Sequence, residues 1–200
     1  IFDFINNTFY FGKKNYFSDS PFRCNASIFR DKSSYSIRKM KIESPIGTLI
    51  SNGNVSLLPK DEYFLDLNVN IETSISDIYK VLPKATVDSL APYKLKANLF
   101  VEGNVKGKIG GKTMPSIMCN VACTKGSAVF DSISYSFATK GIVKAKNLSL
   151  LDSYQYSSET TSVTTGDSKI ELNALSVHNF NNPQYALKGT VDVTIPDFHY

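Results

Sequence analysis

Apolar and polar side chains alternate at every second residue over long parts of the chain. In residues 63–72, Leu65, Leu67 and Val69 fall on one side of an extended backbone, while asparagines and carboxylates fall on the other. Successive side chains of a β-strand point to opposite faces, so this pattern predicts a strand with one apolar face. The same alternation defines three further segments: 95–106, 132–137 and 185–195.

Weaker alternation covers much of the remaining chain. Its segments are 27–42, 48–57, 117–123, 142–150 and 170–177. Residues 157–168 are mostly polar, and we expect them at a mobile hairpin tip or an exposed edge. About ten strands, each with one solvent-exposed polar face, are typical of an antiparallel sheet. The pattern therefore predicts a mainly β fold, in which a strongly curved or twisted sheet forms a trough or an open sandwich.

One segment has helical rather than strand spacing. Apolar residues recur at three- and four-residue intervals through residues 75–82, which favours one face of a helix. Ser74 can cap its start with Asp77 three residues on, and Pro83 stops it. The sequence therefore predicts one short helix near 75–83, with another turn between Thr86 and Leu90.

The stretch VEGNVKGKIGG, which ends at Gly111, resembles a phosphate-binding loop at first sight. Such a loop needs a glycine five residues before Gly111, where this chain has Lys106. It must also lead directly into a helix, whereas Pro115 and its neighbours are typical of a strand. We therefore expect no nucleotide site here.

A structural role explains the recurring glycines better. Gly53, Gly103 and Gly189 each interrupt an alternating segment and are followed by Asn or Thr and then Val. A glycine inside a strand marks a bulge, a bend or a close backbone approach. Repeated bending of one sheet would form a trough; the alternative is that each glycine relieves crowding in an ordinary sandwich.

Composition limits the domain count and the classes of partner. A chain of 200 residues that is 42% hydrophobic can form one good core, so we expect a single domain spanning 1–200. The formal net charge of +4 comes from 22 basic and 18 acidic residues spread along the chain, which does not favour a nucleic-acid partner. No signal peptide or membrane-length apolar run is recognisable. We expect a segment of a longer protein whose membrane anchor lies outside this chain.

The cysteines predict neither a disulfide scaffold nor a metal site. Cys119 and Cys123 lie four residues apart in a predicted strand, which separates their Cα atoms by roughly 13 Å, beyond disulfide reach. We expect both to be small buried apolar residues. Half of a metal site is the weaker alternative, because His178 and His199 lie far along the chain. No metal and no cofactor are therefore expected.

Motifs for catalysis are missing from the sequence. Neither the H-E-x-x-H pattern of metalloproteases nor the G-x-S-x-G pattern of serine hydrolases occurs. We expect a protein that is not an enzyme and has no catalytic residues. An enzyme built from scattered acidic residues stays open as the least favoured alternative, because its carboxylates would meet only in space.

Several segments together resemble a known family. They are Gly47–Leu57, the alternating Tyr63–Ile71, the short helix from Ser76 to Pro83, Leu99–Gly107, Met114–Ile117, Gly126–Val129 and Leu187–Val191. Their order resembles the AsmA-like family of bacterial envelope proteins, in particular the divergent forms of Bacteroidetes-type bacteria. The resemblance implies an inner-membrane anchor, a long β trough in the periplasm, and a kinship with chorein-type bridges that carry phospholipids.

A lipid-binding groove follows from this resemblance and from the one-sided strands. Its predicted floor consists of Leu65, Leu67, Val69, Leu99, Val101, Leu187, Val191 and Val193. The hypothesis is a non-enzymatic envelope segment for phospholipid binding and transfer or for outer-membrane biogenesis. Its partners would be lipid acyl chains, with the membrane or other envelope proteins. The alternative is a closed β-sandwich that acts as an adhesin or a carbohydrate-binding module.

Overall fold

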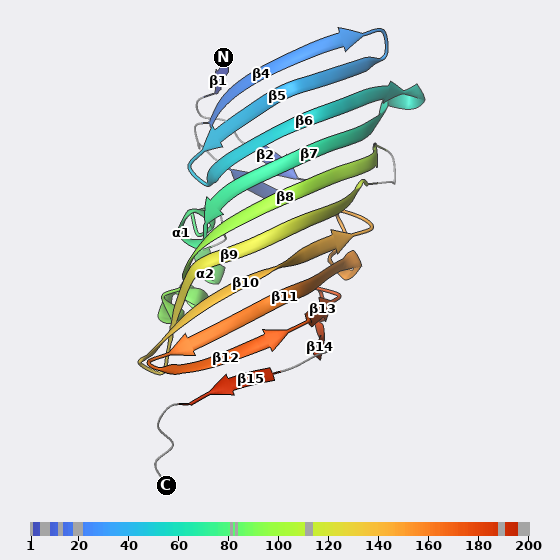
Figure 1. Cartoon of the computed structure of the whole chain (residues 1–200). Helices are drawn as coiled ribbons and strands as arrows, with labels where there is room; N and C mark the ends of the chain where they lie inside the picture. The colour runs from blue at the N-terminus through green and yellow to red at the C-terminus, as the bar shows by residue number, and fades with distance from the viewer. Residues whose placement is uncertain are drawn as a thin grey trace.

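The computed structural model describes residues 2–4, 9–11, 14–17, 22–80, 82, 84–110, 114–187 and 191–195. Thirteen strands form one antiparallel sheet, and β2 (Phe9–Phe11) and β3 (Lys14–Phe17) form a separate hairpin (Figure 1). The strands of the large sheet are β1 (Phe2–Phe4), β4 (Phe22–Asp31), β5 (Ser34–Ser44), β6 (Gly47–Leu58), β7 (Glu62–Ser74), β8 (Lys96–Ile109), β9 (Ser116–Phe130), β10 (Ile133–Ala145), β11 (Tyr154–Thr165), β12 (Ser168–Asn173), β13 (Leu175–His178), β14 (Gln184–Leu187) and β15 (Val191–Thr194).

The sheet is an open meander. Its strand order is β1-β4-β5-β6-β7-β8-β9-β10-β11-β12-β15, while β13 pairs with β11 and β14 pairs with β13. From β4 to β12, each strand pairs with the next one in the chain. The strands at the two ends of this order do not meet, and the whole sheet is twisted (Figure 1). The predicted antiparallel, open β fold is confirmed, and the described strands do not form a closed sandwich.

The prediction for residues 157–168 was wrong for most of the segment, although residues 166–167 form the turn of the β11–β12 hairpin. Most of this polar segment belongs to β11, which pairs with β10 on one side and with β12 and β13 on the other. Threonine is β-branched and suits an extended backbone, and its hydroxyl can bond across strands. The Thr139 and Thr161 hydroxyl oxygens of neighbouring strands lie 2.8 Å apart. A polar strand can therefore occupy the interior of a sheet.

The prediction of one strand over residues 185–195 was also wrong. The structure has two short strands there: β14 pairs with β13, whereas β15 pairs with β12. Alternation alone cannot distinguish one long strand from two short strands in phase. Gly189, the third of the recurring glycines, lies outside the described residues.

Two short helices follow β7. Helix α1 (Ile75–Ile78) begins as predicted, because the Ser74 hydroxyl accepts a hydrogen bond of 3.1 Å from the Asp77 backbone N–H. It is shorter than predicted, and a second helix, α2 (Lys84–Leu90), follows. The described residues also form three short 3-10 turns: η1 (Pro59–Asp61), η2 (Ala91–Tyr93) and η3 (Leu151–Ser153).

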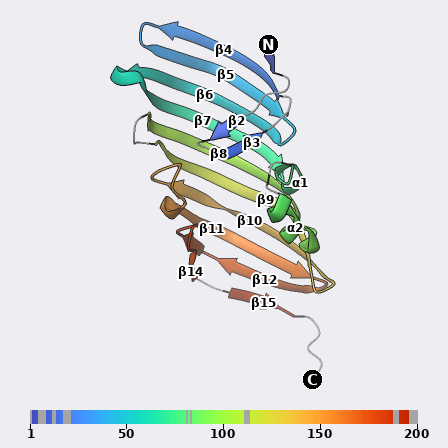
Figure 2. The ribbon, with the colours of Figure 1, turned by 180° about the vertical axis from the view of Figure 1, so that it is seen from behind.

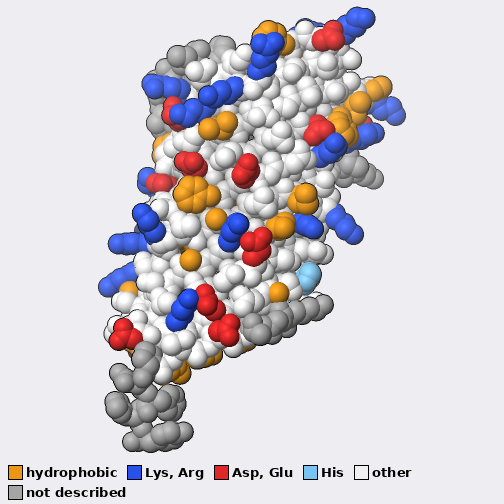
Figure 3. Space-filling view, viewed as in Figure 1, with side chains coloured by type: hydrophobic (Ala, Val, Ile, Leu, Met, Phe, Trp, Pro, Cys, Tyr) orange, Lys and Arg blue, Asp and Glu red, His pale blue; other side chains and the backbone are white. Residues whose placement is uncertain are grey.

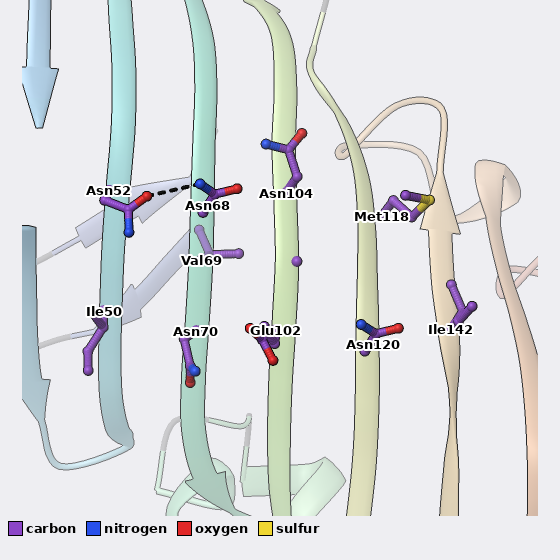
Figure 4. A pocket seen from close by; sticks show the side chains of 11 residues that line it. Ile50, Asn52, Asn68, Val69, Asn70, Glu102, Asn104, Met118, Asn120 and Ile142 are labelled. Carbon is purple, nitrogen blue, oxygen red and sulfur yellow. Dashed lines mark hydrogen bonds between the residues drawn. The ribbon is translucent and has the colours of Figure 1, made fainter. Parts of the chain in front are cut away.

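The two faces of the sheet have different surroundings. We call the face with Leu65, Leu67 and Val69 the apolar face, and the face with Asn68 and Asn70 the polar face. Seen from behind, α1, α2 and the β2–β3 hairpin lie in front of the sheet (Figure 2). The side chains of Asn68 and Asn70 point away from these elements (Figure 4). The helices and the hairpin are therefore on the side of the apolar face.

Two of the recurring glycines allow close backbone contact, as predicted. Gly53 has φ +134° and lies at a register shift between β5 and β6. A Cβ atom on Gly103 would lie 2.2 Å from the carbonyl oxygen of Met118 and 2.5 Å from the Cα of Cys119. Gly103 is therefore required by the close approach of β8 and β9 rather than by a bound phosphate.

Candidate functional site

The five predicted floor residues of β7 and β8 lie together on the apolar face. They are Leu65, Leu67, Val69, Leu99 and Val101. In the sheet register Val69 pairs with Gly103, Ile71 with Val101 and Thr73 with Leu99. Paired residues of antiparallel strands share a face, so these residues form one continuous surface across two strands. All five are half-buried.

The surface continues to the far end of the sheet. A row of paired residues runs from Leu99 through Cys123, Thr139, Thr161 and Leu172 to Val191. Val193 pairs with Ile170 in the adjacent row of the same face. Both valines are on the predicted side, although they are 45% and 54% exposed. Leu187 is in β14 opposite Leu175, and its side chain lies outside the described residues.

Sequence reasoning missed the contribution of β6, β9 and β10 to the floor. These three strands add Leu49, Val55, Ile117, Val121 and Val143 to the surface, and β7 and β8 add Ile71 and Val105 from the predicted alternation. Their alternation is interrupted by Ser51, Gly53 and two cysteines, which weakens the sequence signal. From β6 to β10, no residue that pairs in register on the apolar face carries a charge.

Several hydroxyl groups on the apolar face are bonded to one another or to the backbone, although the buried Ser158 hydroxyl has no partner among the described residues. The Thr139 hydroxyl lies 2.5 Å from the Tyr156 hydroxyl and 2.8 Å from that of Thr161. The Ser51 hydroxyl donates to the Asn68 carbonyl at 2.8 Å. Such pairing removes the cost of holding polar groups away from water. These hydroxyls therefore leave the surface apolar in character.

Cys119 and Cys123 are free thiols, and both are buried among these strands, as predicted. Burial raises the pKa of both thiols above 9.0, because the thiolate form loses its hydration there. Burial also raises the pKa of Tyr154 above 10.0, and the negative charge of an ionised Cys119 adds to that shift. A raised pKa makes both thiols poor nucleophiles and metal ligands.

Only six apolar side chains of the described part of the chain are buried: Ile37, Ala97, Pro115, Cys119, Cys123 and Ala145. A compact domain of this size would bury many more, because helices or a second sheet would cover its apolar faces. The described residues instead form essentially one layer. The described residues therefore cover the apolar face only in part.

The polar face carries the charges of the central strands. In the space-filling view of this face, charged and apolar side chains are scattered over a surface of other side chains and backbone (Figure 3). The Lys106 ammonium lies 2.7 Å from the Asp66 carboxylate and that of Lys140 lies 3.5 Å from Glu159. The hydrogen bonds from Lys106 and then Asn104 hold the pKa of Asp66 below 3.8.

The described residues provide neither a metal site nor a membrane-spanning helix. In the part of the chain that the structure describes, no three His, Cys, Asp or Glu side chains are grouped to hold a metal ion. The described helices are also too short or too polar to cross a bilayer.

Comparisons with known proteins found no family model, no curated protein and no solved structure that matches this chain. The chain is therefore described by its fold and its two surfaces. The described chain is an open, single-layered antiparallel β-sheet with one polar face and one apolar face, which is free of charge from β6 to β10.

Proposed function

We propose that this chain binds the acyl chains of lipids along its apolar face and acts without catalysis. The observation that carries the proposal is the charge-free face from β6 to β10, which an open sheet leaves only partly covered. Large exposed apolar surfaces of soluble proteins mark interaction sites for other proteins, membranes or ligands. A lipid chain is the ligand whose chemistry matches a long surface without charge.

Energetics favour such a surface for lipid transfer. Moving a diacyl lipid from a bilayer into water exposes on the order of 30 CH₂ groups at about 0.8 kcal/mol each, or roughly 24 kcal/mol. Contact with Leu67, Val69 and Val101 and their neighbours would offset much of that cost. Because apolar contact has no preferred direction, an acyl chain could slide along the face with little change in free energy.

The setting of this function follows from the resemblance to the AsmA-like family. We propose a periplasmic segment of a longer envelope protein that is anchored in the inner membrane by a part outside this chain. Its role would be phospholipid transfer or outer-membrane biogenesis. Fractionation of cells that express the full gene product tests the location: recovery in the cytosol would contradict it.

Lipid binding is tested with matched substitutions on the two faces. The double variant Val69→Thr/Val101→Thr keeps the side-chain shape and reduces the apolar surface, and Ile50→Asn/Met118→Asn removes apolar side chains from the opposite face. Native mass spectrometry of protein mixed with phosphatidylglycerol vesicles measures bound lipid. We expect bound lipid on the wild type and the polar-face variant, and several-fold less on the apolar-face variant.

Two results would contradict the proposal. One is a wild-type protein that retains no lipid and extracts none from the vesicles. The other is equal loss of lipid in both double variants, which would remove the apolar face as the site. Circular dichroism of each variant separates loss of binding from loss of fold.

A further inference from the structure

The polar face is hollowed where β6 to β10 cross its centre. This hollow has a volume of about 580 Å³ and is lined by Ile50, Asn52, Asn68, Val69, Asn70, Glu102, Gly103, Asn104, Met118, Asn120 and Ile142 (Figure 4). A second hollow of about 260 Å³ shares Asn70, Glu102 and Asn120 with the first. The combined hollow lies within the range of about 300–1,000 Å³ that small-ligand sites occupy.

A structural role explains some of the asparagines in this hollow. The Asn68 side-chain N–H donates to the Asn52 side-chain oxygen at 2.9 Å (Figure 4). The Asn104 amide donates to the Asp66 carboxylate at 3.2 Å and to the Leu67 carbonyl at 3.1 Å. These three amides tie neighbouring strands together, so their presence needs no ligand.

A second row of polar side chains in the hollow has no such structural role. Asn70, Glu102 and Asn120 pair with one another across β7, β8 and β9. Among the described residues, none of these three side chains has a hydrogen-bond or ion-pair partner. Neighbouring strands lie about 4.8 Å apart, so the row spans about 10 Å of the surface. It presents two amides and one carboxylate to a ligand at regular spacing.

The chemistry of this row matches hydroxyl groups. Each asparagine amide offers two N–H donors and a carbonyl acceptor, and the Glu102 carboxylate accepts only. A sugar hydroxyl both donates and accepts, so adjacent hydroxyls of a sugar ring can bond to such groups in pairs. Regularly spaced polar groups suit a chain of repeated units better than an isolated small molecule.

Apolar side chains border the row on both sides. Phe100 lies two residues before Glu102 on the same face of β8, lines the second hollow and is 41% exposed. Met118 lies on the other side and is 57% exposed. The C–H faces of sugar rings pack against such surfaces, which would otherwise remain in contact with water.

Charge restricts the ligand further. Glu102 is the one charged side chain among the residues that line the larger hollow. The smaller hollow adds Glu72 and Lys140, and the Lys140 ammonium lies 3.5 Å from the Glu159 carboxylate. An anionic glycan would therefore meet a like charge, whereas a neutral glycan would not.

We propose that the row Asn70–Glu102–Asn120, with Phe100 and Met118, binds a neutral oligosaccharide. This site is on the opposite face of the sheet from the proposed lipid surface and does not depend on it. The chain would then hold two chemically different ligands, separated by the thickness of one sheet.

An array of neutral and anionic glycans, followed by titration with maltohexaose, cellohexaose and mannohexaose, tests this proposal. Nuclear magnetic resonance of isotope-labelled protein follows the side-chain amide signals of Asn70 and Asn120. We expect at least one neutral glycan to shift both signals, and Asn70→Ala and Asn120→Ala each to weaken its binding about tenfold. Asn98→Ala is the control, because Asn98 is exposed on the same face of β8 outside both hollows.

Three results would overturn the proposal: no binding of any glycan on the array, binding of anionic glycans alone, or equal weakening by Asn98→Ala. The outcome is distinguishable from failure of the lipid proposal, because no lipid is present in these measurements. Circular dichroism confirms that each alanine variant is folded before its binding is compared.

Discussion

Val69 and Asn70 are neighbours in β7, yet their side chains lie in different environments. Val69 is half-buried on a face that bears no charge from β6 to β10, and Asn70 is exposed in a hollow lined by amides. The same contrast separates Val101 from Glu102 in β8. Each strand therefore contributes to an apolar surface and to a polar surface at alternate residues.

This contrast separates the sources of stability from the sources of recognition. The described chain has few buried apolar residues, and they all belong to the apolar side or to its margins. Stability should therefore depend on substitutions at odd-numbered positions of β7 and β8. Polar-face side chains without a bonded partner, such as Asn70 and Asn120, should tolerate substitution.

The largest loss of stability is expected from a substitution where β8 and β9 approach closely. The substitution Gly103→Val places a Cβ within 2.2 Å of the Met118 carbonyl oxygen, so backbone atoms must move. We expect a loss of about 3 kcal/mol in the free energy of unfolding, measured by urea denaturation. An unchanged midpoint would show that β8 and β9 do not approach as described.

A matched pair of aspartates compares the two faces directly. Val101→Asp introduces a charge on the apolar face without a partner and should cost about 2 kcal/mol. Met118→Asp places the same charge on the polar face, opposite Lys144 in the register, and should change stability by less than about 0.5 kcal/mol. Equal losses in the two variants would contradict the assignment of the faces.

The two faces should lose stability at opposite ends of the pH scale. The pKa of Cys119 and of Cys123 is raised by burial, so the folded state keeps these protons when the unfolded state releases them. Their contribution is fully present below pH 9.0 and is lost as the pH rises through the raised values. The pKa of Asp66 is lowered by Lys106, so its contribution is present above pH 3.8 and is lost as the pH falls.

Thermal melting across this pH range measures both losses. The variant Cys119→Ala/Cys123→Ala should flatten the alkaline decline and leave the acid decline unchanged. Asp66→Asn should weaken the acid decline alone. Lysines that deprotonate at high pH affect both proteins equally, so the difference between the wild type and the cysteine variant isolates the thiols.

The smallest change in stability is expected from substitutions in the row Asn70–Glu102–Asn120. Asn70→Ala and Asn120→Ala remove side chains that have no bonded partner among the described residues. Each should change the free energy of unfolding by less than about 0.5 kcal/mol in the absence of a ligand. Urea denaturation checks this expectation; a loss above about 1 kcal/mol would show that the row supports the sheet instead of a ligand.

Local rules were enough to predict much of this fold. Alternation located the long central strands, such as β7, and placed Leu65, Leu67 and Val69 on one face. The cap formed by Ser74 and Asp77 located the start of α1. These features depend on a few adjacent residues, so they can be read from one short stretch of sequence.

Other features depend on partners that are distant in the chain. Alternation placed Tyr185 and Val191 in one strand, but β14 and β15 pair with different neighbours. The polar β11 is stabilised by β10 and β12 on its two sides, which its own sequence does not reveal. The row of Asn70, Glu102 and Asn120 likewise exists only because the register brings three strands together.

The central claim is that acyl chains lie on the apolar face and not on the polar face. The most direct measurement adds a phosphatidylcholine with a nitroxide label on its acyl chain and follows the methyl signals of the protein by nuclear magnetic resonance. We predict strong broadening for Leu67, Val69 and Val101, and sharp signals for Ile50 and Met118. Equal broadening on both faces, or none on either face, would contradict the account.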